Sequence, residues 1–463
     1  MLNDIISKYK SAFTHNTELR AQVNSEYRLT LDDKDGTIEQ ITQTGGVSAR
    51  IFENGVYGFA ASGTYNEDSV RWVLDTAARN ARAISRYGRR AGKELPDISC
   101  GNIPLNYTVQ TLDPILLREA AEELKRYAES KYAPATAAVD FWNSTSEKLL
   151  VVKNGFDGRS NVVLGSISVY LRKTGPSGDL VTGEETLAIN EYLIDILESK
   201  MLYQMVDRAY ENLRKKLSEE KKEKVTVENG VWDCILSPEF TGMLAHEAVG
   251  HTCEADAVVS EGSIAAAYMG KEVASSLVSL TDFAYEAYGE RCPISLHIDD
   301  EGVACRDAPI IRNGILVGCM TNRLLAERLG VENTGNARAS DYYDEPIVRM
   351  RNTCFLPGNS KLDDMIASIK RGYYLVKSGG GNGSLKGEFR MTMEQGYEIV
   401  DGKLGRPLRG TQCSGVAWEA LKTVDMVSSN FVDSKACGIC GKKQGIPTSQ
   451  GGPEMKMKLH LIG

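Results

Sequence analysis

The sequence predicts an α+β protein of two domains, an N-terminal domain of antiparallel strands and helices (residues 1–225) and a C-terminal β-rich domain (residues 226–463). The chain has 463 residues, more than one hydrophobic core usually organises. Apolar and polar side chains alternate over residues 19–62 and 135–175, as in half-buried strands. Residues 214–224 are charged, mixed in sign and nearly free of apolar side chains, so we place the domain boundary near Val225.

The N-terminal domain is expected to start with a short helix and an antiparallel meander over residues 19–62. The pairs at residues 35–36 and 54–55, Asp-Gly and Asn-Gly, are typical of hairpin turns. A helix is expected over residues 66–86, where apolar residues recur at helical spacing, and another over 113–131, where Asp113 can cap and Pro114 suits the first position. Strands should fill residues 135–175 around a turn at residues 154–155, and a long helix should cover residues 184–217.

The C-terminal domain is expected to contain mostly short strands. A strand at residues 231–237 leads into a helix, and turns should lie at residues 300–302, 313–314 and 401–402. Further helices are expected over residues 362–370 and from about Val416. The Gly-rich stretch 378–384 lacks the Gly-Lys-Ser/Thr ending of a phosphate loop, so close backbone approach or a sharp corner between strands explains its glycines better.

Two of the five histidines, His246 and His251, frame Glu247 in a His-Glu-x-x-x-His pattern directly after a strong helix start. In that start Ser237 can cap, Pro238 suits the first helical position and Glu239 faces the positive end of the dipole. Zinc-peptidase helices usually place their histidines four residues apart. At five residues the rings of a regular helix lie about 140° apart, too far round to reach one ion. A π-type turn would bring them together, so we predict a bulged or terminating helix at residues 246–251.

Two histidines alone hold a catalytic zinc poorly, because three protein ligands and a water are usual. Spacing does not select the third ligand. The candidates near the histidines are Cys253, Glu254 and Asp256, and the distant ones are Cys440, His297 and His460. Ordinary helix-surface or core histidines beside an acid remain the alternative interpretation of the pattern.

Charge and composition exclude several functional classes. The chain carries 54 basic and 62 acidic residues, a net charge of −8, which disfavours a nucleic-acid-binding face. We see neither a secretory peptide nor an apolar run long enough to span a membrane, so a cytoplasmic protein with reduced cysteines is expected. The pair Cys437-x-x-Cys440 has a spacing also used by redox dithiols and zinc knuckles, although no βαβ pattern surrounds it.

Seven features in a fixed order make the comparison with known families more specific than any single motif. They are Gly46-Val-Ser-Ala-Arg50 with Gly55-Val-Tyr-Gly-Phe59; His246-Glu-Ala-Val-Gly-His251; Ile298-Asp-Asp-Glu-Gly302; Asn313-Gly-Ile-Leu-Val-Gly318; Thr334-Gly-Asn-Ala-Arg338; Arg349-Met-Arg-Asn-Thr353 with Leu356-Pro-Gly358; and Cys440-Gly-Lys442. With these features the chain resembles the TldD branch of the TldD/PmbA metalloprotease family over nearly its whole length.

The resemblance implies a zinc site of His246, His251 and Cys440, with Glu247 as general base for peptide hydrolysis. It places Arg338 near the active site, where it would bind substrate. It also implies a dimer, either of two copies or with a PmbA-type subunit, whose sites face an enclosed interior and take small or unfolded peptides as an added β-strand. Where the family needs one cysteine this chain has two, Cys437 and Cys440.

Two other functions compete with a zinc-dependent peptidase. Members of the family have been described as modulators of DNA gyrase, so a non-catalytic regulatory subunit acting through protein partners is the main alternative. A thiol oxidoreductase using Cys437 and Cys440 is the other. The presence of all three implied ligands together with Glu247 favours the enzyme.

Overall fold

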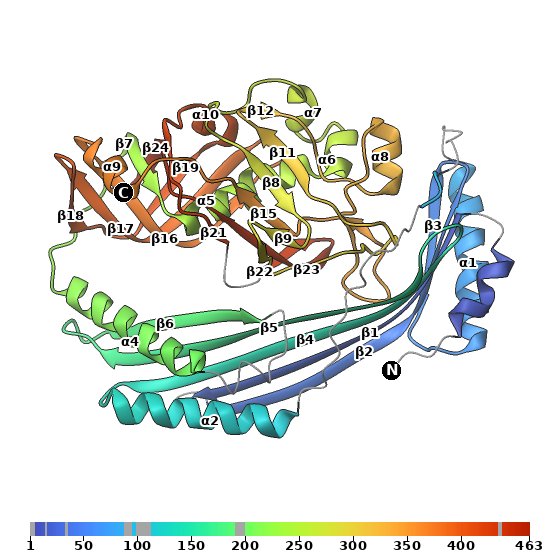
Figure 1. Cartoon of the computed structure of the whole chain (residues 1–463), viewed down its shortest axis with the longest axis horizontal. Coiled ribbons are helices and arrows are strands. Elements are labelled where there is room, and N and C mark those ends of the chain that lie inside the picture. The colour runs from blue at the N-terminus through green and yellow to red at the C-terminus, as the bar shows by residue number, and fades with distance from the viewer. Residues whose placement is uncertain are drawn as a thin grey trace.

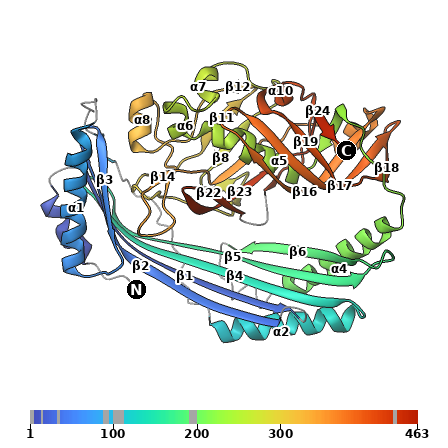
Figure 2. The same cartoon turned by 180° about the vertical axis from the view of Figure 1, so that it is seen from behind.

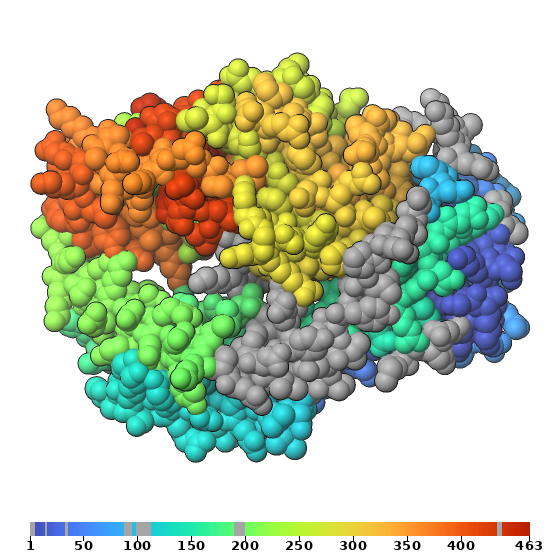
Figure 3. Space-filling model, in the orientation of Figure 1, coloured from blue at the N-terminus to red at the C-terminus, as the bar shows by residue number. Residues whose placement is uncertain are grey.

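The computed structural model describes residues 5–13, 16–32, 36–87, 95–98, 113–189, 200–433 and 438–463. Figure 1 shows a long curved sheet from the N-terminal half below a compact C-terminal part, and Figure 2 shows the same two layers from behind. The space-filling view shows an open gap between the two parts on the side of α4 (Met201–Glu220) (Figure 3). Within the described residues, no helix is long and apolar enough to cross a membrane.

The N-terminal sheet has six antiparallel strands in the order β3-β2-β1-β4-β5-β6. The strands are β1 (Asn16–Asp32), β2 (Gly36–Glu53), β3 (Val56–Ser62), β4 (Thr136–Val152), β5 (Asp157–Thr174) and β6 (Leu180–Ile189). The predicted meander and the strand pair at 135–175 are therefore confirmed. At the turn between β2 and β3, Asn54 and Gly55 have φ of 53° and 86°, the left-handed values that a two-residue hairpin of this twist needs.

Helices pack on one face of this sheet because the odd-numbered residues of β1 and β4 are apolar there. α1 (Glu67–Ser85) covers a core that includes Leu19 and Val151, and α2 (Pro114–Lys131) covers one that includes Leu29 and Phe141. Asn66 and Asp113 cap these two helices, as predicted for Asp113. The 3₁₀ helix η1 (Ile6–Ala12) precedes β1. The other face of the sheet turns toward the C-terminal part.

The predicted helix at 184–217 is wrong at residues 184–189, which belong to β6, and it is confirmed from Met201, where α4 begins; residues 190–199 lie outside the described part of the chain. β6 pairs with β5 over ten positions, from Thr174↔Leu180 to Gly165↔Ile189. A Cβ on Gly183 would lie 2.3 Å from the carbonyl oxygen of Ala209, so α4 packs directly on the strand at this glycine. Hairpin pairing with the preceding strand β5, together with packing of α4, therefore overrides the helix-favouring residues that follow Gly183.

The C-terminal part contains two larger sheets. In the first, the order β16-β7-β24-β19-β17 closes into a ring through a β16–β17 pairing, and β18 (Lys403–Pro407) extends β17. The ring strands are β7 (Gly230–Leu236), β16 (Arg371–Gly383), β17 (Glu388–Val400), β19 (Thr411–Val416) and β24 (Met455–Ile462). β20 (Met426–Val427) adds to β24.

The second sheet has the order β12-β11-β8-β15-β23-β21, with β22 paired to β23. Its strands are β8 (Leu280–Phe283), β11 (Ala308–Arg312), β12 (Ile315–Leu316), β15 (Asn352–Phe355), β21 (Val432–Asp433), β22 (Gly438–Lys442) and β23 (Gln444–Gly452). Two short pairs complete the strands, β9 (Glu286–Ala287) with β10 (Glu290–Arg291) and β13 (Ala337–Arg338) with β14 (Ile347–Val348).

The short helices of the C-terminal part flank these sheets. The predicted helix at 362–370 is the shorter α9 (Leu362–Ala367), and the one near Val416 is α10 (Ala417–Lys422). α6 (Ala255–Val259), α7 (Ala265–Tyr268) and α8 (Arg323–Leu329) complete the set beside the histidine segment described below. The Gly-rich stretch 378–384 lies mostly within β16. The proposed boundary at Val225 falls between α4 and β7 and stays a prediction.

Buried charges join the two parts. Arg50 of β2 donates to Glu18 of β1 at 2.8 Å and also to Glu301, and Arg323 lies 3.1 Å from Glu18. All four side chains are buried. Removal of one partner from such a group leaves an unpaired buried charge, so the group holds the sheet and the C-terminal part in one relative position.

Candidate metal centre

The histidine segment starts with a capped helix, α5 (Pro238–Leu244). The Ser237 hydroxyl accepts from the backbone N–H of Phe240 at 3.3 Å, and Pro238 occupies the first helical position. The Glu239 carboxylate accepts from the backbone N–H of Ser378. The predicted start of this helix is confirmed, and its own apolar residues Phe240 and Leu244 are buried in the C-terminal core.

The helix then changes to a π turn, η2 (Ala245–Gly250), and ends in a 3₁₀ turn, η3 (His251–Cys253). In a π turn residues i and i+5 stack on one face, so His246 and His251 face the same side with ring centroids 5.0 Å apart. Gly250 is needed here because a Cβ would lie 2.2 Å from the sulfur of Met350. The bulged helix predicted from the five-residue spacing is confirmed.

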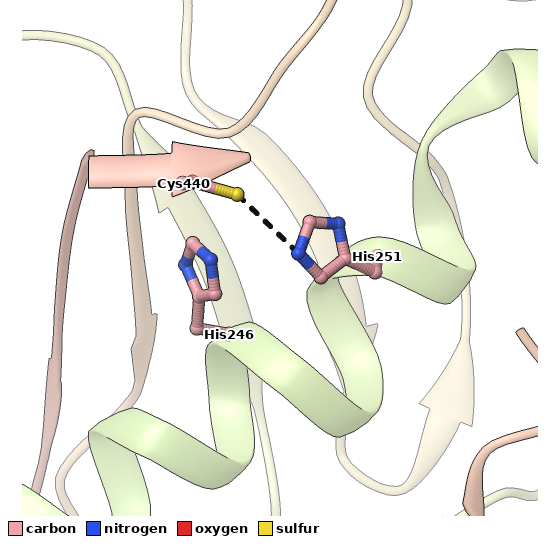
Figure 4. A group of neighbouring side chains, drawn as sticks. All are labelled: His246, His251 and Cys440. Atoms are coloured by element: carbon pink, nitrogen blue, oxygen red, sulfur yellow. Dashed lines mark hydrogen bonds between the residues drawn. The ribbon is translucent and has the colours of Figure 1, made fainter. Parts of the chain in front are cut away.

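Cys440 reaches the two histidines from β22. Its Sγ lies 3.4 Å from Nε2 of His251, and the ligand atoms of His246, His251 and Cys440 all lie within 4.8 Å of one another. Figure 4 shows the sulfur pointing between the two rings. Zn²⁺ bound tetrahedrally at 2.0–2.3 Å separates its ligand atoms by about 3.3–3.8 Å, so small side-chain movements complete the geometry.

Two further observations fit a metal at this place. The buried Nδ1 of His246 has no hydrogen-bond partner. On the far side of His251, Nδ1 lies 3.1 Å from Oε2 of Glu254, the carboxylate contact that commonly orients a metal-binding histidine. Two imidazoles and one sulfur are a donor set that zinc accepts. The residues therefore fit a zinc ion.

Glu254 lies behind the ligands and is not among them. Its Oε2 accepts from Lys442 Nζ at 3.1 Å as well as contacting His251, and its Oε1 lies 3.9 Å from Nε of Arg349. Asp256, another sequence candidate, bonds to Lys442 at 2.7 Å. Both acids thus belong to the charged surroundings of the site.

Arg349 is not among the candidate site residues predicted from the sequence, although it belongs to the family motif Arg349-Met-Arg-Asn-Thr353. Its buried guanidinium donates to the backbone carbonyls of Cys440, of Lys442 (3.3 Å) and of Gln444 (2.8 Å). These three carbonyls belong to the β22–β23 hairpin that carries Cys440. No local sequence signal identifies such a role, because the partners are backbone atoms more than 90 residues away.

Glu247 lies beside the three candidate ligands and lines with them a cavity of about 410 Å³. Burial raises the pKa of Glu247, while His251 and a backbone N–H from Gly383 lower it by less. Gly383 belongs to the end of β16, and a Cβ there would lie 2.1 Å from the carbonyl oxygen of Glu247. The close backbone approach expected for the Gly-rich stretch is thus made to Glu247.

The two histidines differ in protonation. Burial lowers the pKa of His246 to about 3, so that ring is neutral. Burial also acts to lower the pKa of His251, but its contacts with Cys440 and Glu254 outweigh this and raise the pKa to about 10. One ring is thus ready to bind a cation, and the other must first lose a proton.

Comparisons with known proteins agree with this geometry. A sequence model described as the PmbA/TldA metallopeptidase C-terminal domain matches residues 229–462. A protein of Saccharolobus solfataricus named zinc metalloprotease TldD homolog is 34% identical over 436 residues, 90% of each chain. The chain belongs to the TldD/PmbA metallopeptidase family. The names of its relatives place it in the TldD branch.

Other relatives match either about half of this TldD-branch chain or nearly all of it. A metalloprotease TldD homolog of Haemophilus influenzae is 35% identical over 236 residues, 50% of this chain and 48% of that one. The crystal structure of TldE from Thermococcus kodakarensis matches with a TM-score of 0.74 over 98% of both chains at 18% identity. At that identity the likeness establishes the shared fold.

Other sequence candidates of this TldD-family chain lie away from the metal centre. His297 packs against Tyr285, with ring centroids 4.6 Å apart, and His460 lies in β24 opposite Val231. Cys253 is buried, and burial raises the pKa of its thiol to about 12. Cys437 lies outside the described residues, so its role is not decided.

Arg338, expected to bind substrate, is buried and donates from Nη1 to the carbonyl of Met350 at 2.7 Å. The Arg338 side chain lines a second cavity, which is not the cavity lined by Glu247. Burial lowers its pKa to about 10. Its contact with a substrate stays a prediction.

Proposed function

We propose that the chain is a zinc-dependent peptidase that hydrolyses small or unfolded peptides, with His246, His251 and Cys440 as metal ligands. The observation that carries the proposal is the convergence of these three donors beside Glu247, whose carboxylate is left outside the donor group. Membership in a metallopeptidase family supports it.

Zinc, when bound, supplies a Lewis acid that polarises a peptide carbonyl and makes a water molecule more acidic. Glu247 takes the proton of the attacking water and passes it to the leaving amine. The raised pKa of Glu247 makes its carboxylate a better acceptor for the proton of the attacking water, and its acid form can still give that proton to the leaving amine, which is more basic. Cys440 donates more charge than a third imidazole, so we expect slow or selective hydrolysis.

The edge of β22 supports binding of the peptide as an added strand. In the described part of the chain, β22 pairs with β23 alone, which leaves its other edge next to the candidate ligand Cys440. A Cβ built on Gly438 or Gly441 of this strand meets no atom within 4 Å, so there is open space at both positions. Main-chain hydrogen bonds to such an edge give affinity with little side-chain selectivity.

The proposal extends to assembly. We propose that the chain works as a dimer, either with itself or with a PmbA-type subunit, as the family resemblance implies. Measurement of the molecular mass in solution, for the chain alone and after mixing with a PmbA-type subunit, distinguishes a homodimer from a heterodimer.

The decisive experiment compares the unaltered chain with Glu247→Gln for zinc content and peptide cleavage. We expect full zinc in both proteins and cleavage only by the first. Cleavage that persists in Glu247→Gln removes this residue as the base. If neither protein cleaves any peptide, the regulatory alternative leads; a structure from Thermotoga maritima with the same fold (TM-score 0.74) is titled as a suggested modulator of a DNA gyrase.

A further inference from the structure

A second cavity, of about 310 Å³, lies between the curved sheet and the C-terminal part. Its floor is the middle of β1, β2, β4 and β5, and its roof includes residues 296–300, 337–341 and the β22–β23 hairpin. Figures 1 and 2 both place this hairpin over the middle of β4 and β5. The cavity is therefore formed only when the two parts of the chain come together.

The floor is polar on β1, β2 and most of β4, and it is apolar at Trp142 and at Val162 and Leu164 of β5. Even-numbered residues of β1 and β4 point into the cavity, and odd-numbered ones such as Leu29 and Phe141 pack under the helices. Strand register places Asn24 opposite Thr44 and Ser146, and Glu26 opposite Thr42 and Ser144. On these three strands the two neighbouring rows thus carry small or polar side chains, and on β5 the rows continue with Val162 and Leu164. The two β5 residues pack against the C-terminal part, whereas the polar part of the rows lines the cavity.

Hydrogen bonds fix the walls of the cavity. Lys148 of β4 donates to Asp300 and to the carbonyl of Ala339, and Asn24 donates to the carbonyl of Ser340. The backbone N–H of Ser340 in turn donates to Gln444 of the hairpin. The cavity is thus a preformed site with side-chain hydroxyls and amides on its floor.

The cavity lies next to the metal pocket, and Ile439 of β22 lines both. This side chain is 64% exposed. Its neighbour on the strand is the candidate ligand Cys440, which lines the metal pocket. A peptide that lies along β22 past the metal centre is therefore adjacent to the second cavity.

We propose that this cavity is a second substrate site, which holds the extended segment of an unfolded peptide that flanks the cleaved bond. The site would bind the segment through its main chain and through small, uncharged or basic side chains. Acidic lining groups (Glu26, Asp300 and Asp341) outnumber basic ones (Lys148 and Arg338) even without Asp299, whose pKa burial raises well above its ordinary value, so an acidic segment is disfavoured. The inference rests on the proposed peptidase function and adds a requirement for peptide length and charge.

The test fills the cavity and compares peptides of two lengths. Ser144→Phe and Ser146→Phe place a ring on the floor, and Gln40→Phe is the matched control, since it lies on the same face of β2 but outside the cavity lining. The substrates are a 4-residue and a 12-residue unstructured peptide that share one cleaved bond. We expect KM for the long peptide to rise about tenfold in both cavity variants, with unchanged KM for the short one. Zinc content and thermal stability should match the control.

Direct binding separates this inference from the proposed function. Fluorescence anisotropy of a labelled 12-residue peptide is measured with the unaltered chain, Ser144→Phe and Gln40→Phe, each also with Glu247→Gln. If the long peptide binds and Ser144→Phe weakens it about tenfold, the site stands even where no peptide is cleaved. Equal affinity in Ser144→Phe and Gln40→Phe, no binding by the unaltered chain, or equal affinity for acidic and basic versions of the peptide overturns the inference.

Discussion

His251 lies between a sulfur and a carboxylate, with Nδ1 3.1 Å from Oε2 of Glu254 on the side opposite Cys440. The Glu254 carboxylate thereby orients the His251 ring, and Lys442 Nζ donates a hydrogen bond to the same carboxylate. This chain of contacts links η3 to the β22 hairpin, the segments that supply the candidate ligands His251 and Cys440.

Replacement of Glu254 by Gln should weaken zinc binding by about 10–100-fold, because it removes the charge that orients His251. Zinc affinity is measured by competition with a chromophoric chelator. Asp256→Asn is the control, since Asp256 bonds to Lys442 rather than to His251. An equal loss in both variants would show that the general negative charge matters more than the contact with His251.

Arg349→Met should destabilise the fold by about 3 kcal/mol or more, because three buried carbonyls lose a charged donor. It should also lower zinc affinity, since the hairpin that carries Cys440 loses its support. Urea unfolding and zinc titration check the two effects. Arg371→Met, which removes an exposed arginine, is expected to change neither.

Gly383→Ala should reduce cleavage while zinc remains bound. The added methyl group would lie 2.1 Å from the carbonyl oxygen of Glu247, and that backbone must move to admit it. We expect a loss of stability of about 1–3 kcal/mol and a lower kcat. In Gly410→Ala the nearest atom would be 3.8 Å away, so this variant should behave as the unaltered chain. Unchanged kcat in Gly383→Ala contradicts the placement of Glu247.

Cys440→Ser should abolish stoichiometric zinc binding if Cys440 is the third ligand. Cys437→Ser tests the neighbouring thiol, which lies outside the described residues. Metal analysis after dialysis distinguishes the two, and substantial zinc in Cys440→Ser would show that Cys437 can take its place.

Zinc affinity should rise with pH through the neutral range and beyond. The pKa of His251 is raised to about 10 in the metal-free chain, so its ring carries a proton at pH 7 that zinc must displace. A histidine with the ordinary pKa near 6.5 would impose no such dependence above pH 7.5. Because a cysteine ligand also loses its proton on binding zinc, the His251 ring itself is followed by NMR titration of the metal-free chain. A His251 ring that is already neutral at pH 7 contradicts this assignment.

Local sequence signals determined the caps at Asp113 and Ser237, the hairpin turn at Asn54 and the π turn between His246 and His251. Each depends on residues close together in the chain, whose spacing and backbone preferences act before any distant contact forms. The family resemblance, rather than spacing, pointed to Cys440.

Tertiary structure alone decided three further matters. Residues 180–189 became a strand because β5 and α4 offered partners that local propensity does not register. Arg349 acquired its role by folding against the distant hairpin that carries Cys440. The second cavity exists only between surfaces from two halves of the chain. Hydrogen bonds and burial between distant segments depend on the whole fold, and for that reason no single stretch of sequence specifies them.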